Sequence, residues 1–175
     1  MNKTPMIAMI ALTLASATAF AADTGEQSEM MAAAKALITP DKAVAIAEQI
    51  GGRAYAMGME VAGSGHWYEV DVLRNGKPVE VRIDSDNGKV LGSSAARGED
   101  ANGAHALAQG KLTLGAAIAD AERAGSGTAM EATSNGSGSR AAVIVDVVHG
   151  NTISHYRESM VGGQIRGVKT AAGAD

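Results

Sequence analysis

The sequence lacks cysteine altogether and has few aromatic residues. Without cysteine the chain can form no disulfide framework and perform no thiol chemistry, so its stability must come from packing. One tryptophan, three tyrosines and one phenylalanine are present, so a core must be built from Val, Ile, Leu, Met and Ala. The net charge of −4 argues against binding of nucleic acid, which rewards clustered Lys and Arg.

The N-terminal segment is typical of a secretory signal peptide. Lys3 precedes an apolar run from Met6 to Leu14, and Ala19 and Ala21 have the small-x-small spacing of a cleavage site. We expect cleavage after Ala21. An uncleaved anchor is the less favoured alternative, because the apolar run is shorter than the about 20 residues of a transmembrane helix. We therefore predict a periplasmic or secreted protein with no stable membrane insertion.

Hydrophobic periodicity predicts a helix after Thr39 and strands after it. Thr39 suits the N-cap, Pro40 suits the first helical position, and Gly51 and Gly52 can end the helix. The apolar stripe has helical spacing: Ala43, Ile46, Ala47 and Ile50. The hydrophobic period then changes to two over 67–74 and 78–84, which predicts two strands. Asn75-Gly76 between them is typical of a hairpin turn. Residues 54–61 are expected to form a preceding strand.

The same order of patterns recurs in the second half of the chain. Thr113 matches Thr39 and Glu122 matches Glu48, each 74 residues later, and Asp146 matches Asp71 75 residues later. The predicted fold class is therefore α+β, with two small repeats that each pack a helix on an antiparallel β-sheet.

Composition and periodicity divide the chain into six segments. They are a signal peptide (1–21), an N-terminal extension (22–37) that is either a helix or a tether, a first unit (38–92), a linker (93–110), a degenerate second unit (111–170) and a tail (171–175).

The first unit resembles the PepSY family. That family's pattern has A-x-x-x-A in the helix, which Ala43 and Ala47 match, and Y-E-V in a strand, which Tyr68-Glu69-Val70 matches. It ends with D-x-x-x-G-K-V after a strand, which is matched by Asp84, Gly88, Lys89 and Val90, followed here by Leu91. The second unit departs from it, since Ser159 replaces the aspartate and 142–145 replaces the Y-E-V start. Members are similar to segments of the propeptides of thermolysin-like metalloproteases. The resemblance implies a helix on an antiparallel sheet and no catalytic residues.

The stretch RIDSDNGKV, residues 82–90, raises three alternatives: a calcium loop, a catalytic acid/base pair or a turn. An EF-hand loop needs a ligand where Gly88 falls, and a glutamate at its twelfth position is missing. Asp84, Asp86 and Asn87 suit a turn, and Gly88 supplies a positive φ. We predict a turn, with weak cation binding as the alternative.

Other candidate sites are weaker still. Glu69 and Asp71 share a strand face, where cross-strand charge pairs are favoured over acid/base catalysis. The four histidines, His66, His105, His149 and His155, lack the spacing of a zinc motif. Met57 and Met59 would share a strand face, where core filling is favoured over binding of a soft metal. The segment SNGSGS, residues 134–139, resembles a phosphate-binding loop only in composition.

The sequence thus predicts a non-enzymatic exported binding module, with no catalytic residues, metal or cofactor. Its partner would be an envelope protein or a protease, held by exposed sheet edges and hairpin tips. The candidate binding residues are Tyr68, Glu69, Asp71, Arg82, Asp84 and Asp86. The alternative is an accessory protein that senses a metal or small ligand through Met57, Met59 and the histidines.

Overall fold

The computed structural model describes residues 19–96, 104, 107, 110–161 and 165–168. Most of the predicted signal peptide, most of the linker and the whole tail (171–175) therefore lie outside the described residues. The described part is a mixed structure of helices and one antiparallel sheet, as the predicted α+β class requires.

Residues 40–95, which we call the first half, form one helix and four strands. Helix α2 spans Pro40–Glu48, and the strands are β1 (Arg53–Ala62), β2 (Gly65–Arg74), β3 (Lys77–Asp84) and β4 (Val90–Ala95). Thr39 is the N-cap residue of α2, but its side chain makes no capping hydrogen bond. The predicted Asn75-Gly76 turn joins β2 to β3, and both residues have positive φ.

The second half repeats this order of elements. Helix α4 spans Leu114–Gly125, and the strands are β5 (Thr128–Asn135), β6 (Ala142–His149), β7 (Thr152–Ser159) and β8 (Ile165–Val168). A 3-10 turn, η1 (Gly138–Arg140), lies between β5 and β6. Here the threonine does cap its helix, since Thr113 accepts a hydrogen bond from the Ala116 N–H at 3.1 Å.

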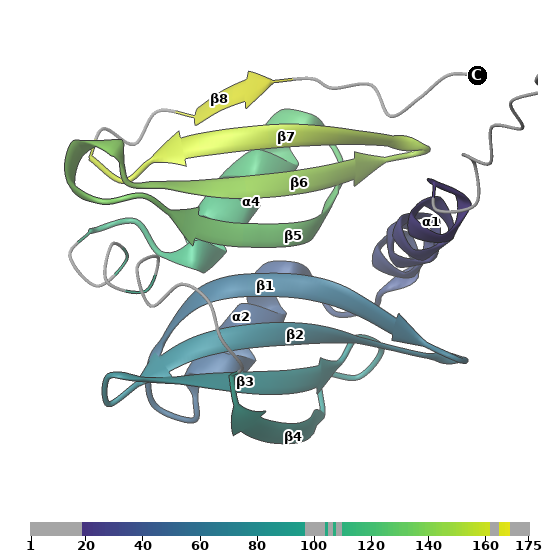
Figure 1. The fold of residues 1–175 in the computed structure, drawn as a ribbon, viewed down its shortest axis with the longest axis horizontal. Coiled ribbons are helices and arrows are strands. Elements are labelled where there is room, and N and C mark those ends of the chain that lie inside the picture. Colours follow the sequence, from purple (N-terminus) through teal and green to yellow (C-terminus); the bar gives the residue numbers. More distant parts are fainter. Residues whose placement is uncertain (1–18, 97–103, 105–106, 108–109, 162–164, 169–175) are drawn as a thin grey trace, which may run out of the picture.

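All eight strands form a single sheet in the order β4-β3-β2-β1-β5-β6-β7-β8 (Figure 1). The two halves are joined through β1 and β5, whose pairing covers only Ala56↔Thr133, Met57↔Ala132 and Gly58↔Glu131. The sheet is therefore continuous. The sequence analysis had instead predicted a separate small sheet for each helix.

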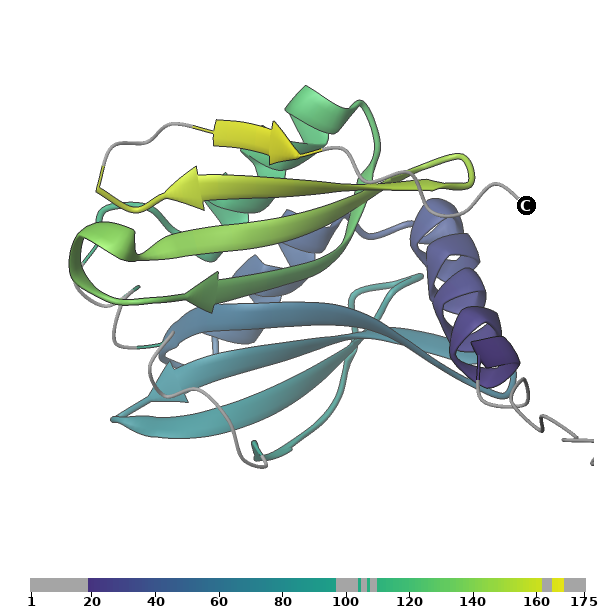
Figure 2. The same ribbon diagram turned by 45° about the horizontal axis from the view of Figure 1, so that its top comes forward.

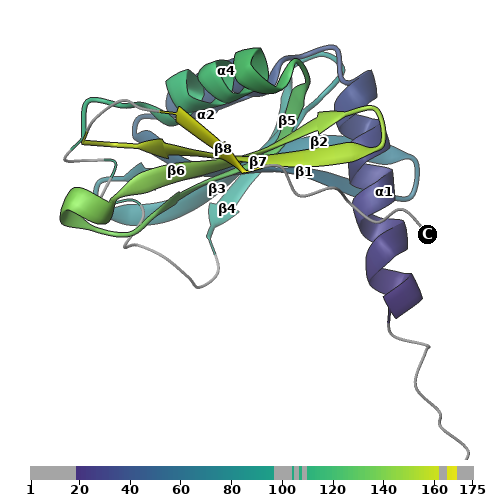
Figure 3. The same ribbon diagram turned by 90° about the horizontal axis from the view of Figure 1, so that it is seen from above.

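Helices α2 and α4 cover the same face of the sheet and contact each other, as Figure 3 shows from above. Buried aliphatic residues of both helices, including Val44 and Ile118, pack on strand residues such as Val70 and Val145. One hydrophobic core thus spans both halves. The opposite face of the sheet carries no helix along most of its length, and we call it the open face.

The N-terminal extension is a helix, which settles the alternative that the sequence left open. Helix α1 spans Ala19–Lys35 and lies against one end of the sheet, where it contacts β1, β5 and β6 (Figure 2). It buries Met30, Ala32 and Ala33 there. Among the described residues, no helix combines the length and apolar character needed to cross a membrane.

Each half contains the same contact between its helix and its first strand. Glu48 accepts a hydrogen bond from the Ala54 N–H at 2.9 Å, and Glu122 accepts one from the Ala129 N–H at 2.9 Å. Both alanines lie at a bulge, where the strand register shifts and a backbone N–H needs a partner outside the ladder.

Two glycines preceding these bulges also correspond. A Cβ on Gly52 would lie 2.8 Å from the Leu73 carbonyl oxygen, and one on Gly127 would lie 2.1 Å from the Val148 carbonyl oxygen. Glycine is required at both positions because the neighbouring strand passes so close.

We expect that Glu48→Ala and Glu122→Ala each lower the free energy of unfolding by about 1–3 kcal/mol, because a partly buried N–H at the bulge loses its acceptor. Chemical denaturation would measure this. Glu26→Ala, at an exposed position of α1, is the matched control and should change stability by less than about 0.5 kcal/mol. Equal stability of Glu122→Ala and the control would show that the carboxylate does not support the bulge.

Candidate functional site

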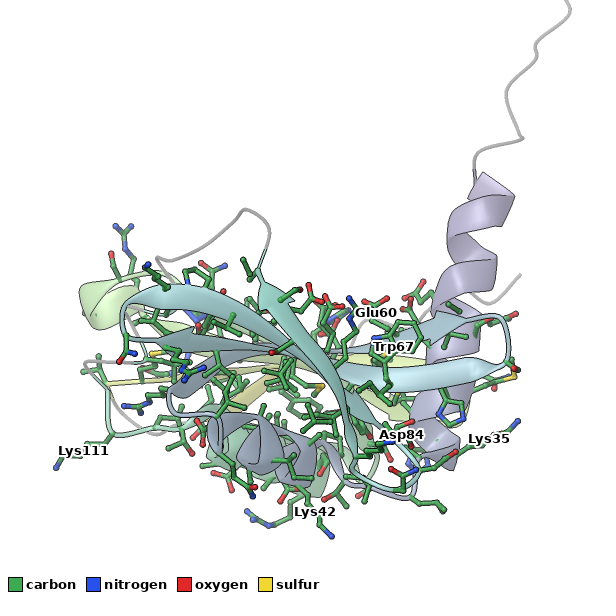
Figure 4. The ribbon with its side chains drawn as sticks, turned by 90° about the horizontal axis from the view of Figure 1, so that it is seen from below. Lys35, Lys42, Glu60, Trp67, Asp84 and Lys111 are labelled. Carbon is green, nitrogen blue, oxygen red and sulfur yellow. The ribbon has the colours of Figure 1, made fainter. Side chains whose placement is uncertain are left out.

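The structure separates the predicted binding residues into three groups. Glu69, Asp71 and Arg82 lie on the open face of the sheet, whereas the Asp84 and Asp86 carboxylates belong to the turn after β3. Tyr68 points to the helix-covered face and is completely buried. In Figure 4, Glu60 and Trp67 project from the side of the sheet opposite Lys42 of α2, which marks the open face.

Tyr68 is part of the core. Its hydroxyl donates to the Ile38 carbonyl oxygen at 3.0 Å, which ties the segment before α2 to the sheet. Burial raises the pKa of Tyr68, and the carboxylates of Glu122 and Asp41 add to this. The Y-E-V motif thus supplies two core residues, Tyr68 and Val70, and one open-face residue, Glu69.

The turn prediction for residues 82–90 is confirmed. Asp84 Oδ1 accepts from the backbone N–H groups of Asp86 (2.9 Å) and Asn87 (3.1 Å), and Gly88 has a φ of +74°. The Asp84 carboxylate is therefore occupied by its own turn, which is the arrangement expected of an Asx turn.

The same turn also anchors the start of α2. Ser85 is completely buried, and its carbonyl oxygen accepts from the Leu37 and Ile38 N–H groups at 3.0 and 2.9 Å. Its hydroxyl donates to the His66 carbonyl oxygen and also contacts the His66 ring. The motif is thus a structural clamp between helix and sheet.

The open face of the first half carries a shallow acidic groove of about 270 Å³. Its acidic lining residues come from four elements: Glu29 of α1, Glu60 of β1, Glu69 and Asp71 of β2, and Glu131 of β5. Glu80 of β3 lies opposite Asp71 in the strand register. Arg82 bonds Glu80 on its own strand at 3.1 Å rather than Glu69 across from it.

Partial burial raises the pKa values of all five groove carboxyls, and neighbouring carboxylates raise them further. Asp71 is the strongest case: burial, then Glu69 and Glu80, raise its pKa from 3.8 to about 6. The carboxylates of the groove therefore repel one another at neutral pH. Protonation or a cationic partner would reduce this repulsion. Sequence patterning placed Glu69 and Asp71 together but missed Glu29, Glu60 and Glu131, which tertiary packing brings beside them.

The histidines and methionines do not form a shared site. His149 contacts the Ser126 carbonyl oxygen at 2.6 Å on the helix side, whereas His155 contacts Asp146 at 2.5 Å on the open face. Met57 and Met59 are buried in the core. The described part of the chain has no group of three or more His, Asp or Glu residues placed to hold a metal ion. His105 lies outside the described residues.

The sequence analysis expected exposed sheet edges but did not identify the strand that supplies one, which is β4. All six residues of β4 are exposed, and none is charged. Beside β4 lies a hollow of about 300 Å³, lined by Trp67, Arg82, Leu91, Gly92 and Ser93. Trp67 Nε1 is shielded from solvent and has no hydrogen-bond partner among the described residues.

We expect Asp71→Asn to raise the free energy of unfolding by about 1 kcal/mol near pH 7.5. A pKa shift from 3.8 to about 6 corresponds to about 1.4 kcal/mol per unit, reduced here because the carboxyl is partly exposed. The folded pKa is the higher one, so the cost of the charged form is present above pH 6 and disappears as pH falls below about 4.

Denaturation at pH 7.5, 6 and 4 would measure this gain and its loss. Asp86→Asn, on the exposed turn, is the control and should change stability by less than about 0.5 kcal/mol at every pH. A gain for Asp71→Asn that persists at pH 4 would contradict the explanation by charge.

Comparison with known proteins agrees with this geometry. Residues 37–93, which contain α2 and β1 to β4 up to Ser93, match the family model described as "Peptidase propeptide and YPEB domain" (PepSY). No curated protein matches the chain. Among solved structures, the chain is similar to a "putative lipoprotein" from Clostridium difficile 630, with 12% identity, a TM-score of 0.44, and coverage of 78% of this chain and 95% of that one. The match of residues 37–93 to the PepSY family model confirms the resemblance seen in the sequence of the first unit.

Proposed function

We propose that the protein is an exported, non-enzymatic binding module that regulates a protease or another envelope protein. The PepSY match points to a propeptide-like, inhibitory or regulatory module and to no catalytic family. Export is supported by the signal-peptide pattern of residues 1–21. The Asp84 carboxylate of the turn accepts hydrogen bonds from two backbone N–H groups, which favours a structural role for it over catalysis.

Strand β4 is the proposed contact surface, and the observation that carries the proposal is its uncharged edge, which pairs with no further strand in the described part of the chain. Natural sheets usually protect an edge strand with charge, proline or a covering element. Strand β8 at the other edge carries Arg166, whereas β4 has no charge and exposes Val90 and Leu91 at 42% and 51%. An extended segment of a partner could add to β4 as a ninth strand.

The hollow beside β4 would supply specificity for such a partner. A side chain of the added strand would enter between Trp67 and Leu91. The unsatisfied Trp67 Nε1 donor favours a side chain that carries a hydrogen-bond acceptor, because a buried donor without a partner is costly.

We propose further that the chain contains two related units, 38–92 and 111–170, connected by the linker 93–110. The matching carboxylate contacts of Glu48 and Glu122 and the matching close approaches at Gly52 and Gly127 support a duplication. The second unit has lost the motif aspartate, since Ser159 stands where Asp84 stands in the first. The first unit is therefore proposed to carry the binding role, with the second completing its core.

We expect Leu91→Lys to abolish partner binding, because an edge lysine opposes strand addition and fills the hollow with charge. Pull-down from an envelope extract, followed by inhibition assays on the captured protease, would measure it. Val161→Lys is the matched control, since Val161 is 69% exposed and distant in sequence from β4. Capture of the same protein by wild type and control but not by Leu91→Lys is the expected result, and equal capture by all three would rule out the β4 edge.

A further inference from the structure

The open face of the second half contains a hollow that the proposed function does not use. It has a volume of about 390 Å³ and lies beside η1, between β5 and β7. Asn135, Gly136, Ser137, Arg140, Ile144 and Arg157 line it. Its walls are therefore two arginines, an amide, a hydroxyl and backbone, with one aliphatic side chain.

The arginines here have no acidic partner. Arg157 lies directly opposite Arg166 of β8 in the strand register, and its Nη2 donates to the Arg140 carbonyl oxygen at 2.8 Å. Among the described residues, no carboxylate forms an ion pair with Arg140, Arg157 or Arg166. Like charges directly opposite each other destabilise a sheet, so the described residues leave the charge of this cluster uncompensated.

The first half shows how such an arginine is normally neutralised in this fold. Arg82, 75 residues before Arg157, is bonded to Glu80 at 3.1 Å. The residue 75 positions after Glu80 is His155, which instead contacts Asp146 at 2.5 Å. The second half has thus lost the carboxylate that would pair with Arg157 and has kept the arginine.

We propose that this hollow binds a phosphoryl group. Guanidinium groups present paired N–H donors that match phosphate oxygens, and the Ser137 hydroxyl and Asn135 amide can add neutral donors. At Gly136 the backbone has a φ of +79°, and a Cβ there would lie 2.8 Å from the Arg140 carbonyl oxygen, so the turn beside the arginines requires glycine.

This site differs from a P-loop, because it depends on two arginines from separate elements and not on a helix N-terminus. It also rests on observations separate from the β4 edge. The phosphoryl group could belong to a soluble phosphate compound or to a phospholipid headgroup, which share the same chemistry. Because the protein has a net charge of −4, its surface as a whole would not attract an anionic phosphate compound or headgroup. The attraction would come from the arginine cluster alone.

The test uses the full mature chain and two probes, inorganic pyrophosphate in calorimetry and phosphatidylglycerol vesicles in flotation. We expect saturable binding in at least one arm. Arg157→Gln and Arg140→Gln should each weaken it about tenfold or more, as loss of a charge-assisted hydrogen bond requires. Arg74→Gln removes an exposed arginine at a hairpin end of the first half and should leave binding unchanged.

Either arm would support the proposal and would identify the source of the phosphoryl group. Binding of pyrophosphate alone would indicate a soluble ligand, and binding of phosphatidylglycerol vesicles but not phosphatidylcholine vesicles would indicate a headgroup. Arg140 and Arg157 are exposed, so circular dichroism should show all variants folded. The proposal is overturned if neither probe binds at millimolar concentration, or if Arg74→Gln weakens binding as much as Arg157→Gln does.

Discussion

The short pairing of β1 with β5 is the constraint on which the rest of the structure depends. Only three residue pairs join the two halves in the sheet, yet they align the strands so that α2 and α4 lie side by side on one face. Helices built largely from alanine bury little apolar area individually. A common core lets each half complete the other, which suits a chain that has no disulfide and almost no aromatic residues to stabilise a smaller unit.

The two faces of this sheet consequently have different properties. The helix-covered face holds most of the buried apolar side chains of the strands, including Tyr68, Met57 and Met59. The open face collects charge, with carboxylates concentrated over β1 to β3 and arginines concentrated near η1 and β8. Because few of these charges are paired, with the Arg82–Glu80 and His155–Asp146 contacts as exceptions, each region carries electrostatic repulsion that a ligand of opposite charge or a change in pH would relieve.

The turn at residues 82–90 illustrates how a family motif can be structural. Asp84 and Asn87 accept hydrogen bonds from backbone N–H groups of the turn, and Gly88 leaves space that Ile38 and Ile46 occupy. A Cβ at Gly88 would lie 3.1 Å from Ile46 Cδ1, so the glycine serves packing as well as the positive φ. The turn therefore has a structural task that the exposed residues of β4 do not share.

Local chemistry in the sequence was sufficient to predict the helix after Thr39, the strands around Asn75-Gly76, the turn at Gly88 and the PepSY resemblance, because periodicity, turn residues and caps act over a few residues. The tertiary structure decided the remainder. The joining of both halves into one sheet, the approach of Glu29 and Glu131 to Asp71, and the assembly of Arg140, Arg157 and Arg166 depend on contacts between residues far apart in the chain. Such contacts follow from packing of a shared core, which no local pattern encodes.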